Sequence, residues 1–202
     1  MLAFHNDPII KEKYLKRVNA HYKADEIIHG AYWQNGKGCA VGCTVEKNSN
    51  AHEAMEKELG IPKDLAFLED RIFEGLENGL AKEFPLKFLK AITPGADLSK
   101  VTAKFIIWLL ADPKDGVMRF AFDDGKKAIK EVVKLYKEEL KGKKVSSAAW
   151  SAAWSAARSA AWSAESAAWS AARSAESAAR SAESAAYRVM SEKLIELLKE
   201  CE

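Results

Sequence analysis

Residues 147–187 read SAAWSAAWSAARSAAWSAESAAWSAARSAESAARSAESAAY, a run of short units that each begin with serine. From Ser155 the serines recur in steps of four, four and three, an eleven-residue repeat of about 3.67 residues per turn. This period keeps one stripe of side chains on one side of a nearly straight α-helix. Alanine is the strongest helix former, and no glycine or proline interrupts residues 145–202. The sequence therefore predicts one long helix from about Ser147 to about Lys199.

A second stripe on this helix, formed by the residue before each serine, is rich in tryptophan at first and in charge later. At 1.5 Å per residue the helix would span roughly 80 Å. A compact domain of this chain length is only about 45 Å across. We therefore expect residues 147–200 to act as an oligomerisation arm that pairs with another copy of the chain. Exposed tryptophans and the apolar face of the last turns would otherwise lack a partner; a solvated single helix is the alternative.

The residues before this repeat differ sharply in composition, since they hold all eleven glycines, all five prolines and all four histidines. Apolar residues recur there at helical spacing, and no pair of alternating strands with a hairpin turn is found. We expect an all-α protein with a helical ligand-binding body at residues 1–144 and a helical arm at 145–202. At most a small β element is expected, near residues 31–46.

Capping and helix-breaking residues mark the expected helices of the body. Asp7 would cap a helix that has Pro8 at its first position and stops at Gly30. Further helices are expected at residues 50–60, 62–76, 84–92, 97–111 and 125–140, and residues 116–122 would be a short helix or an extended piece.

The overall composition excludes several classes of protein. The net charge of +2 does not favour a nucleic-acid binder. The longest apolar run, residues 105–111, is far shorter than the ~20 residues of a membrane span, and no signal-peptide pattern is present at the N-terminus. Three cysteines cannot form a disulfide scaffold. We expect a cytoplasmic protein with reduced thiols that binds neither nucleic acid nor membrane.

Three motifs of the body are long and distinctive: HNDP at residues 5–8, GKGCAVGCT at 36–44 and LEDRIFEGL at 68–76. With the alanine-rich C-terminal repeat, they resemble an uncharacterised family of proteins encoded by bacteria and their phages. The resemblance implies a common fold over the body but no reaction. Phage provenance would favour proteins that interfere with the host, including ones that sequester nucleotide signals of bacterial immunity.

The glycine-rich loop at residues 36–44 is the first candidate site. Its glycines can take positive φ values, its amides can form an anion nest, and Lys37 adds positive charge. It lacks the Gly-Lys-Ser/Thr ending of a Walker motif. We expect non-enzymatic binding of a small anionic, nucleotide-derived ligand and no cofactor; a structural loop is the alternative. The expected ligand contacts are Tyr14, Arg17, His21, Asp25, Trp33, Lys37, Gly38, Cys39, Cys43 and Thr44.

An enzyme is the second class of function. Cys39 would be a nucleophile if His21 served as its base and Asp25 oriented that base. The alternative is a pair of buried thiols beside a solvated helix face. A third class is a structural or protein-interaction module in which the arm is the functional part.

A zinc site is a further alternative, because four side chains supply two nitrogens and two sulfurs. Their spacing of ten, four and nine residues is not that of a standard finger or ribbon. The carboxylates of Glu69, Asp70 and Glu74 flank Arg71 on one expected helix and are expected to be solvated or paired with Arg71. Metal binding or acid–base work by these carboxylates is the alternative. The four candidate zinc ligands are His29, Cys39, Cys43 and His52.

Overall fold

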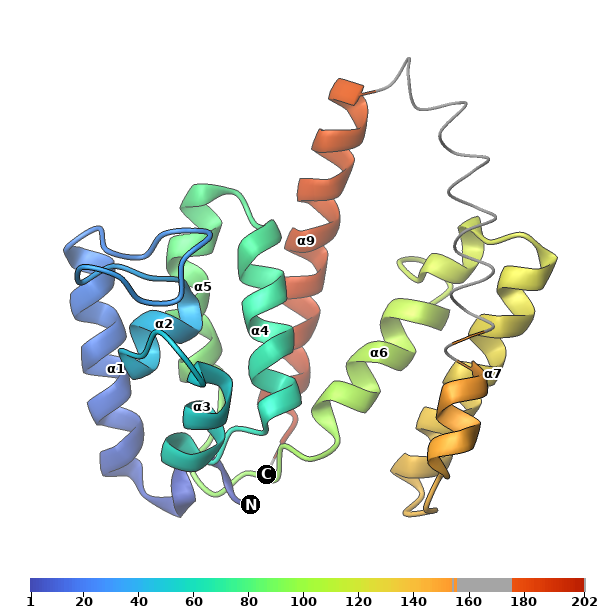
Figure 1. The fold of residues 1–202 in the computed structure, drawn as a ribbon, viewed down its shortest axis with the longest axis horizontal. Helices are drawn as coiled ribbons and strands as arrows, with labels where there is room; N and C mark the ends of the chain where they lie inside the picture. The colour runs from blue at the N-terminus through green and yellow to red at the C-terminus, as the bar shows by residue number, and fades with distance from the viewer. Residues whose placement is uncertain (154, 156–175, 202) are drawn as a thin grey trace. The chain divides into compact units, whose positions relative to one another are not determined.

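The computed structural model describes residues 1–153, 155 and 176–201 (Figure 1). Within this part of the chain the secondary structure is helical, with β-structure limited to isolated bridges, which confirms the all-α class. The bridge between Ile27 and Gly38 and that between Gln34 and Lys37 lie in the region where a small β element was expected. The helices are η1 (Ala3–Asn6), α1 (Pro8–Lys23), α2 (Ala40–Val45), α3 (Ala51–Leu59), α4 (Lys63–Gly75), α5 (Asn78–Ala91), α6 (Val101–Ala111), η2 (Val117–Phe120), α7 (Asp123–Leu140) and α9 (Glu176–Lys199).

The chain packs as two compact units. Unit 1 consists of Met1–Thr102 and Glu183–Glu202, and unit 2 of Ala103–Ala182. The expected division into a ligand-binding body at 1–144 and an oligomerisation arm at 145–202 concerns function and stays a prediction.

Helix α1 begins as its sequence predicts. Oδ1 of Asp7 accepts a hydrogen bond from the Ile9 amide at 2.8 Å, and Pro8 occupies the first turn, where its missing N–H removes no helical bond. The helix ends at Lys23, before the expected stop at Gly30. Two residues later Asp25 takes a left-handed conformation (φ 58°), which turns the chain out of the helical path.

The short helix α2 was missed by the sequence analysis and lies at the centre of unit 1. All six of its residues are buried, and it contacts α1, α3, α4 and α5 (Figure 1). Gly38 and Gly42 allow the backbone of Tyr32 to approach it closely. A Cβ at these two positions would lie 1.9 and 1.4 Å from the Tyr32 carbonyl oxygen, so both positions require glycine.

The C-terminal turns of α9 belong to unit 1. Leu194, Leu197 and Leu198 are buried there, and α9 runs beside α4 (Figure 1). The ring of Tyr187 lies so near Gly75 of α4 that a Cβ on that glycine would come within 2.3 Å of it. The apolar face of the last turns therefore has a partner within its own chain.

Unit 2 contains most of α6, then η2, α7 and the start of the serine–alanine repeat. The Ser146 hydroxyl accepts a hydrogen bond from the Ala149 amide at 3.2 Å, which confirms the start of a helix there. Trp150 packs edge-on against Tyr136 of α7, with 4.6 Å between ring centroids. Of the predicted helix from Ser147 to Lys199, residues 147–153, 155 and 176–199 are helical, and the remainder lies outside the described residues.

No helix in the described ranges combines the length and the apolar character that crossing a membrane requires.

Candidate functional site

The two basic side chains of α1 that were expected to contact the ligand, Arg17 and His21, already contact acidic side chains. Arg17 donates to the Thr44 carbonyl at 3.0 Å and pairs with Glu46 at 3.4 Å. His21 lies between two carboxylates, with Nδ1 2.6 Å from Glu26 and Nε2 3.3 Å from Glu46. Glu46 takes a left-handed conformation (φ 54°) at the end of α2, and its carboxylate contacts both Arg17 and His21. An anionic ligand at this place would have to displace these carboxylates.

Five amides of the glycine-rich loop have acceptors within the chain. These five amides are not available for the expected anion nest, and the glycines at 38 and 42 serve the close approach of Tyr32. The hydroxyl of Thr44 donates to the Ala40 carbonyl at 2.8 Å and is likewise engaged. The amides of Lys37, Gly38 and Cys39 donate to the backbone carbonyls of Gln34, Glu26 and Ala31, respectively. The Gly42 amide donates to the Cys39 sulfur, and the Cys43 amide donates to the Cys39 carbonyl.

The other expected contacts face different neighbours. The Tyr14 hydroxyl donates to Glu58 at 2.6 Å. Trp33 meets His21 edge-on, with 5.0 Å between ring centroids. Asp25 is largely exposed and pairs with Lys82 of α5. Tyr14, Arg17, His21 and Trp33 thus belong to internal contacts of unit 1, and Asp25 lies apart from them.

The arrangement of Cys39, His21 and Asp25 as nucleophile, base and orienting acid is not assembled. Asp25 is paired with Lys82, and the carboxylate that holds His21 is Glu26. Burial and the nearby Asp70 carboxylate raise the pKa of the Cys39 thiol far above its ordinary value. A thiol in this state contains almost no thiolate at neutral pH, which disfavours nucleophilic attack.

The second thiol of the loop is equally protected. Cys43 is buried, and its sulfur donates to the Gly38 carbonyl at 3.2 Å. Burial raises the pKa of this thiol to about 12. Both loop cysteines therefore fit the alternative of buried structural thiols better than that of a reactive pair.

The four residues expected to hold zinc do not converge. The His29 ring nitrogen is hydrogen-bonded to the Phe73 carbonyl at 3.2 Å, and Cys43 is bonded to backbone oxygens. A different cluster forms instead from Cys39, Asp70 and Glu74, whose ligand atoms all lie within 4.8 Å of one another. His52 joins it indirectly, because its Nε2 lies 3.2 Å from Oδ2 of Asp70.

Glu69 departs from the expectation that the acidic residues of this helix are solvated. Its exposed fraction is 1%, and burial, followed by the charge of Asp70, raises its pKa well above the ordinary value. Oε2 of Glu69 and Oδ1 of Asp70 are both buried without a hydrogen-bond partner among the residues that the structure describes. Buried polar atoms are nearly always satisfied in folded proteins, so this pair marks an unusual place in unit 1.

A lysine-lined groove on α7, in unit 2, was not identified from the sequence. It has a volume of about 460 Å³, with Ala111, Met118 and Val133 as its apolar lining and Glu138 as its acidic member. Its four lysines are all exposed and recur at intervals of four, three and four residues, which places them on one face of the helix. This spacing is visible in the sequence and was the signal that could have revealed the groove. The lysines are Lys130, Lys134, Lys137 and Lys141.

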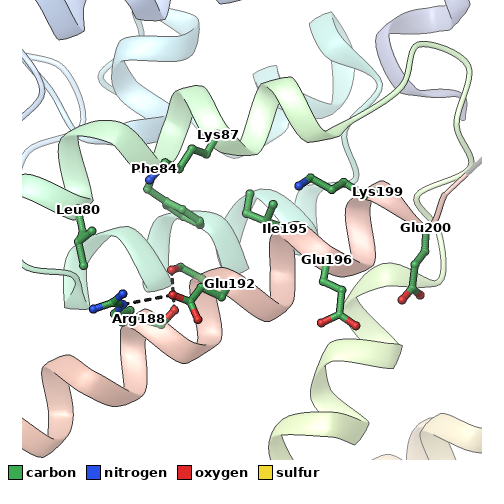
Figure 2. Close-up of a pocket in the computed structure, with 10 residues that line it drawn as sticks. Leu80, Phe84, Lys87, Arg188, Glu192, Ile195, Glu196, Lys199 and Glu200 are labelled. Carbon is green, nitrogen blue, oxygen red and sulfur yellow. Dashed lines mark hydrogen bonds and ion pairs between the residues drawn. The ribbon is translucent and has the colours of Figure 1, made fainter.

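A larger groove of about 590 Å³ lies between α5 and α9 in unit 1 (Figure 2). Leu80, Phe84 and Ile195 provide its apolar surface. Its rim carries both signs of charge, and Figure 2 shows Arg188 directed at Glu192, with 3.2 Å between the nitrogen and the carboxylate oxygen. Because cations and anions alternate on this rim, it does not select a ligand by net charge.

No family model, curated protein or solved structure matches this chain. The resemblance to bacterial and phage-encoded proteins therefore stays a prediction.

Proposed function

We propose that the protein binds a small anionic, phosphate-bearing ligand of nucleotide type without converting it, and that the lysine-lined groove on α7 is the binding surface. The observation that carries this proposal is the row of four exposed lysines beside an apolar lining. The groove replaces the glycine-rich loop as the proposed location, because Arg17, His21 and five of the loop amides already have partners within unit 1.

The charge of this row favours an anion. Lysines three or four residues apart on a helix have Cβ atoms about 5–6 Å apart, and such like-charged pairs repel each other. Lys134 has a partial partner in Glu131 at 3.9 Å, and both side chains of this pair are well exposed. A multiply charged phosphate compound would relieve the repulsion and contact several ammonium groups at once.

The apolar lining favours a ligand with more than phosphate. Met118 and Val133 offer the groove an unbranched thioether and a branched aliphatic side chain, surfaces on which a base or a sugar can pack. Binding without conversion is supported by the two buried loop thiols, whose raised pKa values disfavour nucleophilic chemistry. Sequestration of a nucleotide signal of bacterial immunity is the use that the resemblance to phage proteins favours.

Self-association through residues 147–200 belongs to the same proposal. The eleven-residue repeat and its tryptophan stripe support it. The two ends of this segment that the structure describes pack within their own units, Trp150 against Tyr136 and the last leucines within unit 1, so a partner would have to contact other side chains of the segment. Sedimentation of the full chain gives the oligomeric state directly.

Calorimetric titration with inorganic phosphate, pyrophosphate, ATP and a cyclic dinucleotide tests the binding proposal. In the test variant, glutamine replaces the four groove lysines. In the control variant, it replaces four exposed lysines of unit 1, Lys23, Lys57, Lys90 and Lys100, which gives the same change in net charge.

The test variant should bind a nucleotide about tenfold or more weakly than the native protein, and the control should bind unchanged. The affinity should also fall as salt is added. Absence of binding to all four compounds, or equal weakening in both variants, would refute the proposal. A nucleotide recovered chemically altered would show an enzyme.

A further inference from the structure

We infer that Cys39, Asp70 and Glu74 form a binding site for a divalent transition-metal ion of the zinc type, with His52 as a positioning residue. The three ligand atoms lie within 4.8 Å of one another in unit 1. This site is separate from the lysine groove of unit 2, so each proposal can be refuted without affecting the other.

The fold brings the three side chains together from two helices. Cys39 precedes the first turn of α2, which packs against α4. Asp70 and Glu74 are four residues apart on α4 and therefore share one face of that helix. Both carboxylate oxygens of Glu74 also accept from the Gly30 amide at 3.1 Å, which keeps this exposed side chain near the cluster.

Unpartnered oxygens provide the second, independent observation. His52 occupies Oδ2 of Asp70, and Oδ1 of the same carboxylate is buried without a hydrogen-bond partner among the described residues. The preceding residue, Glu69, is 1% exposed, and its Oε2 likewise lacks a partner among them. A metal ion bound between Cys39 and Asp70 would give Oδ1 of Asp70 the partner that it lacks.

The donor set determines the class of metal. One sulfur and two carboxylate oxygens suit zinc, which forms bonds of about 2.3 Å to sulfur and about 2.0–2.2 Å to oxygen. Tetrahedral ligands at these bond lengths are roughly 3.5 Å apart. The side chains must therefore approach one another slightly, and Glu74, which is exposed, has room to move. Three protein ligands leave one position open to water or a small ligand.

The surroundings fit such a site. Carboxylates that bind a metal are themselves commonly held by hydrogen bonds from neighbouring groups, and His52 lies in position to hold Asp70 in this way. His52 is itself held between two aromatic rings, stacked on Phe67 at 3.8 Å and edge-on to Tyr32 at 5.5 Å between centroids. On metal binding the Cys39 S–H bond breaks, the sulfur–metal bond forms, and the thiol proton passes to solvent.

Titration of the full chain with Zn²⁺, followed by Co²⁺ as a spectroscopic substitute, tests the inference. We expect one ion per chain and a thiolate-to-cobalt charge-transfer band. Glu74→Gln is the main variant, because this residue is exposed and glutamine keeps an acceptor for the Gly30 amide. Asp70→Asn is the second variant. Glu83→Gln is the matched control, since Glu83 is a solvent-exposed glutamate of α5 that pairs with Lys87.

Glu74→Gln and Asp70→Asn should each weaken Zn²⁺ binding about tenfold or more, and the control should bind as the native chain does. Circular dichroism of each variant establishes that it has folded. No bound Zn²⁺ in the native chain, a cobalt spectrum without the thiolate band, or equal affinity in all folded variants would overturn the inference.

Discussion

Nε2 of His52 lies 3.2 Å from Oδ2 of Asp70, and the other oxygen of that carboxylate is buried without a hydrogen-bond partner in the described part of the chain. The histidine comes from α3 and the aspartate from α4, so packing of these two helices fixes the orientation of the carboxylate. A hydrogen-bond donor at position 52 thus decides which oxygen of Asp70 remains for a metal ion.

The first prediction concerns this donor. His52→Leu removes the N–H and should weaken Zn²⁺ binding about 10–100-fold, because an orienting hydrogen bond to a ligand is lost. His52→Gln retains a donor and should restore much of the affinity. Both variants should keep the thiolate-to-cobalt band, since Cys39 is untouched. A loss of the band in His52→Leu would show that the histidine is itself a ligand or a structural support.

The second prediction follows from the buried carboxyl of Glu69, whose pKa is raised by burial and by Asp70. Below pH 4.5, its ordinary value, both folded and unfolded chains hold the proton. As pH rises above 4.5, the unfolded chain ionises while the folded chain keeps the proton, so the free energy of unfolding falls by up to ~1.4 kcal/mol per pH unit.

Glu69→Gln removes this dependence. In the presence of a chelator, the variant should become more stable relative to the native chain as pH rises from about 5 to about 8, the range in which folded proteins tend to be most stable. Urea unfolding at each pH measures the difference. Glu83→Gln, at an exposed glutamate, should show no such trend. A difference that stays constant with pH would mean that Glu69 is ionised in the folded protein.

The helices were predictable because their signals are local. Asp7 and Pro8 mark the start of α1, and the apolar spacing of α4 and α7 is visible without knowledge of the partners. The end of α1 was not predictable, because nothing in the residues around Asp25 requires a left-handed turn. Likewise α2 is only six residues long, too short for a periodic pattern, and its burial follows from packing.

The contacts within the candidate site could not be predicted from the sequence, for a different reason. Charges such as Arg17, His21 and Lys37 are visible in a sequence, but their partners are not. Glu46 is far from Arg17 along the chain, and only the fold shows that it pairs with both Arg17 and His21. The lysine row of α7 was recognisable from its helical spacing alone, since a single helix places it on one face.

The third prediction tests why residue 42 is glycine. Alanine there would place its Cβ 1.4 Å from the Tyr32 carbonyl oxygen, a backbone atom that cannot rotate away. Gly42→Ala should lower the free energy of unfolding by about 3 kcal/mol or more. Gly79→Ala is the matched control: its Cβ would meet nothing within 4 Å, so it should be neutral or stabilise α5 by up to ~1 kcal/mol. Urea unfolding curves compare the two, and equal effects would show that the loop backbone yields.

The fourth prediction tests the attachment of α9 to unit 1. Leu198 is completely buried, and its replacement by alanine should lower the free energy of unfolding by about 2–5 kcal/mol, because the removed methyl groups leave a cavity. Val189, on the same helix but 36% exposed, is the control, and Val189→Ala should change stability by about 0.5 kcal/mol at most. Measurements at several protein concentrations distinguish packing of this leucine face within its own chain from contact between two copies. If it packs within its own chain, the loss is the same at every concentration. If it instead joins two copies, the native chain must become more stable as concentration rises, and Leu198→Ala must remove that dependence.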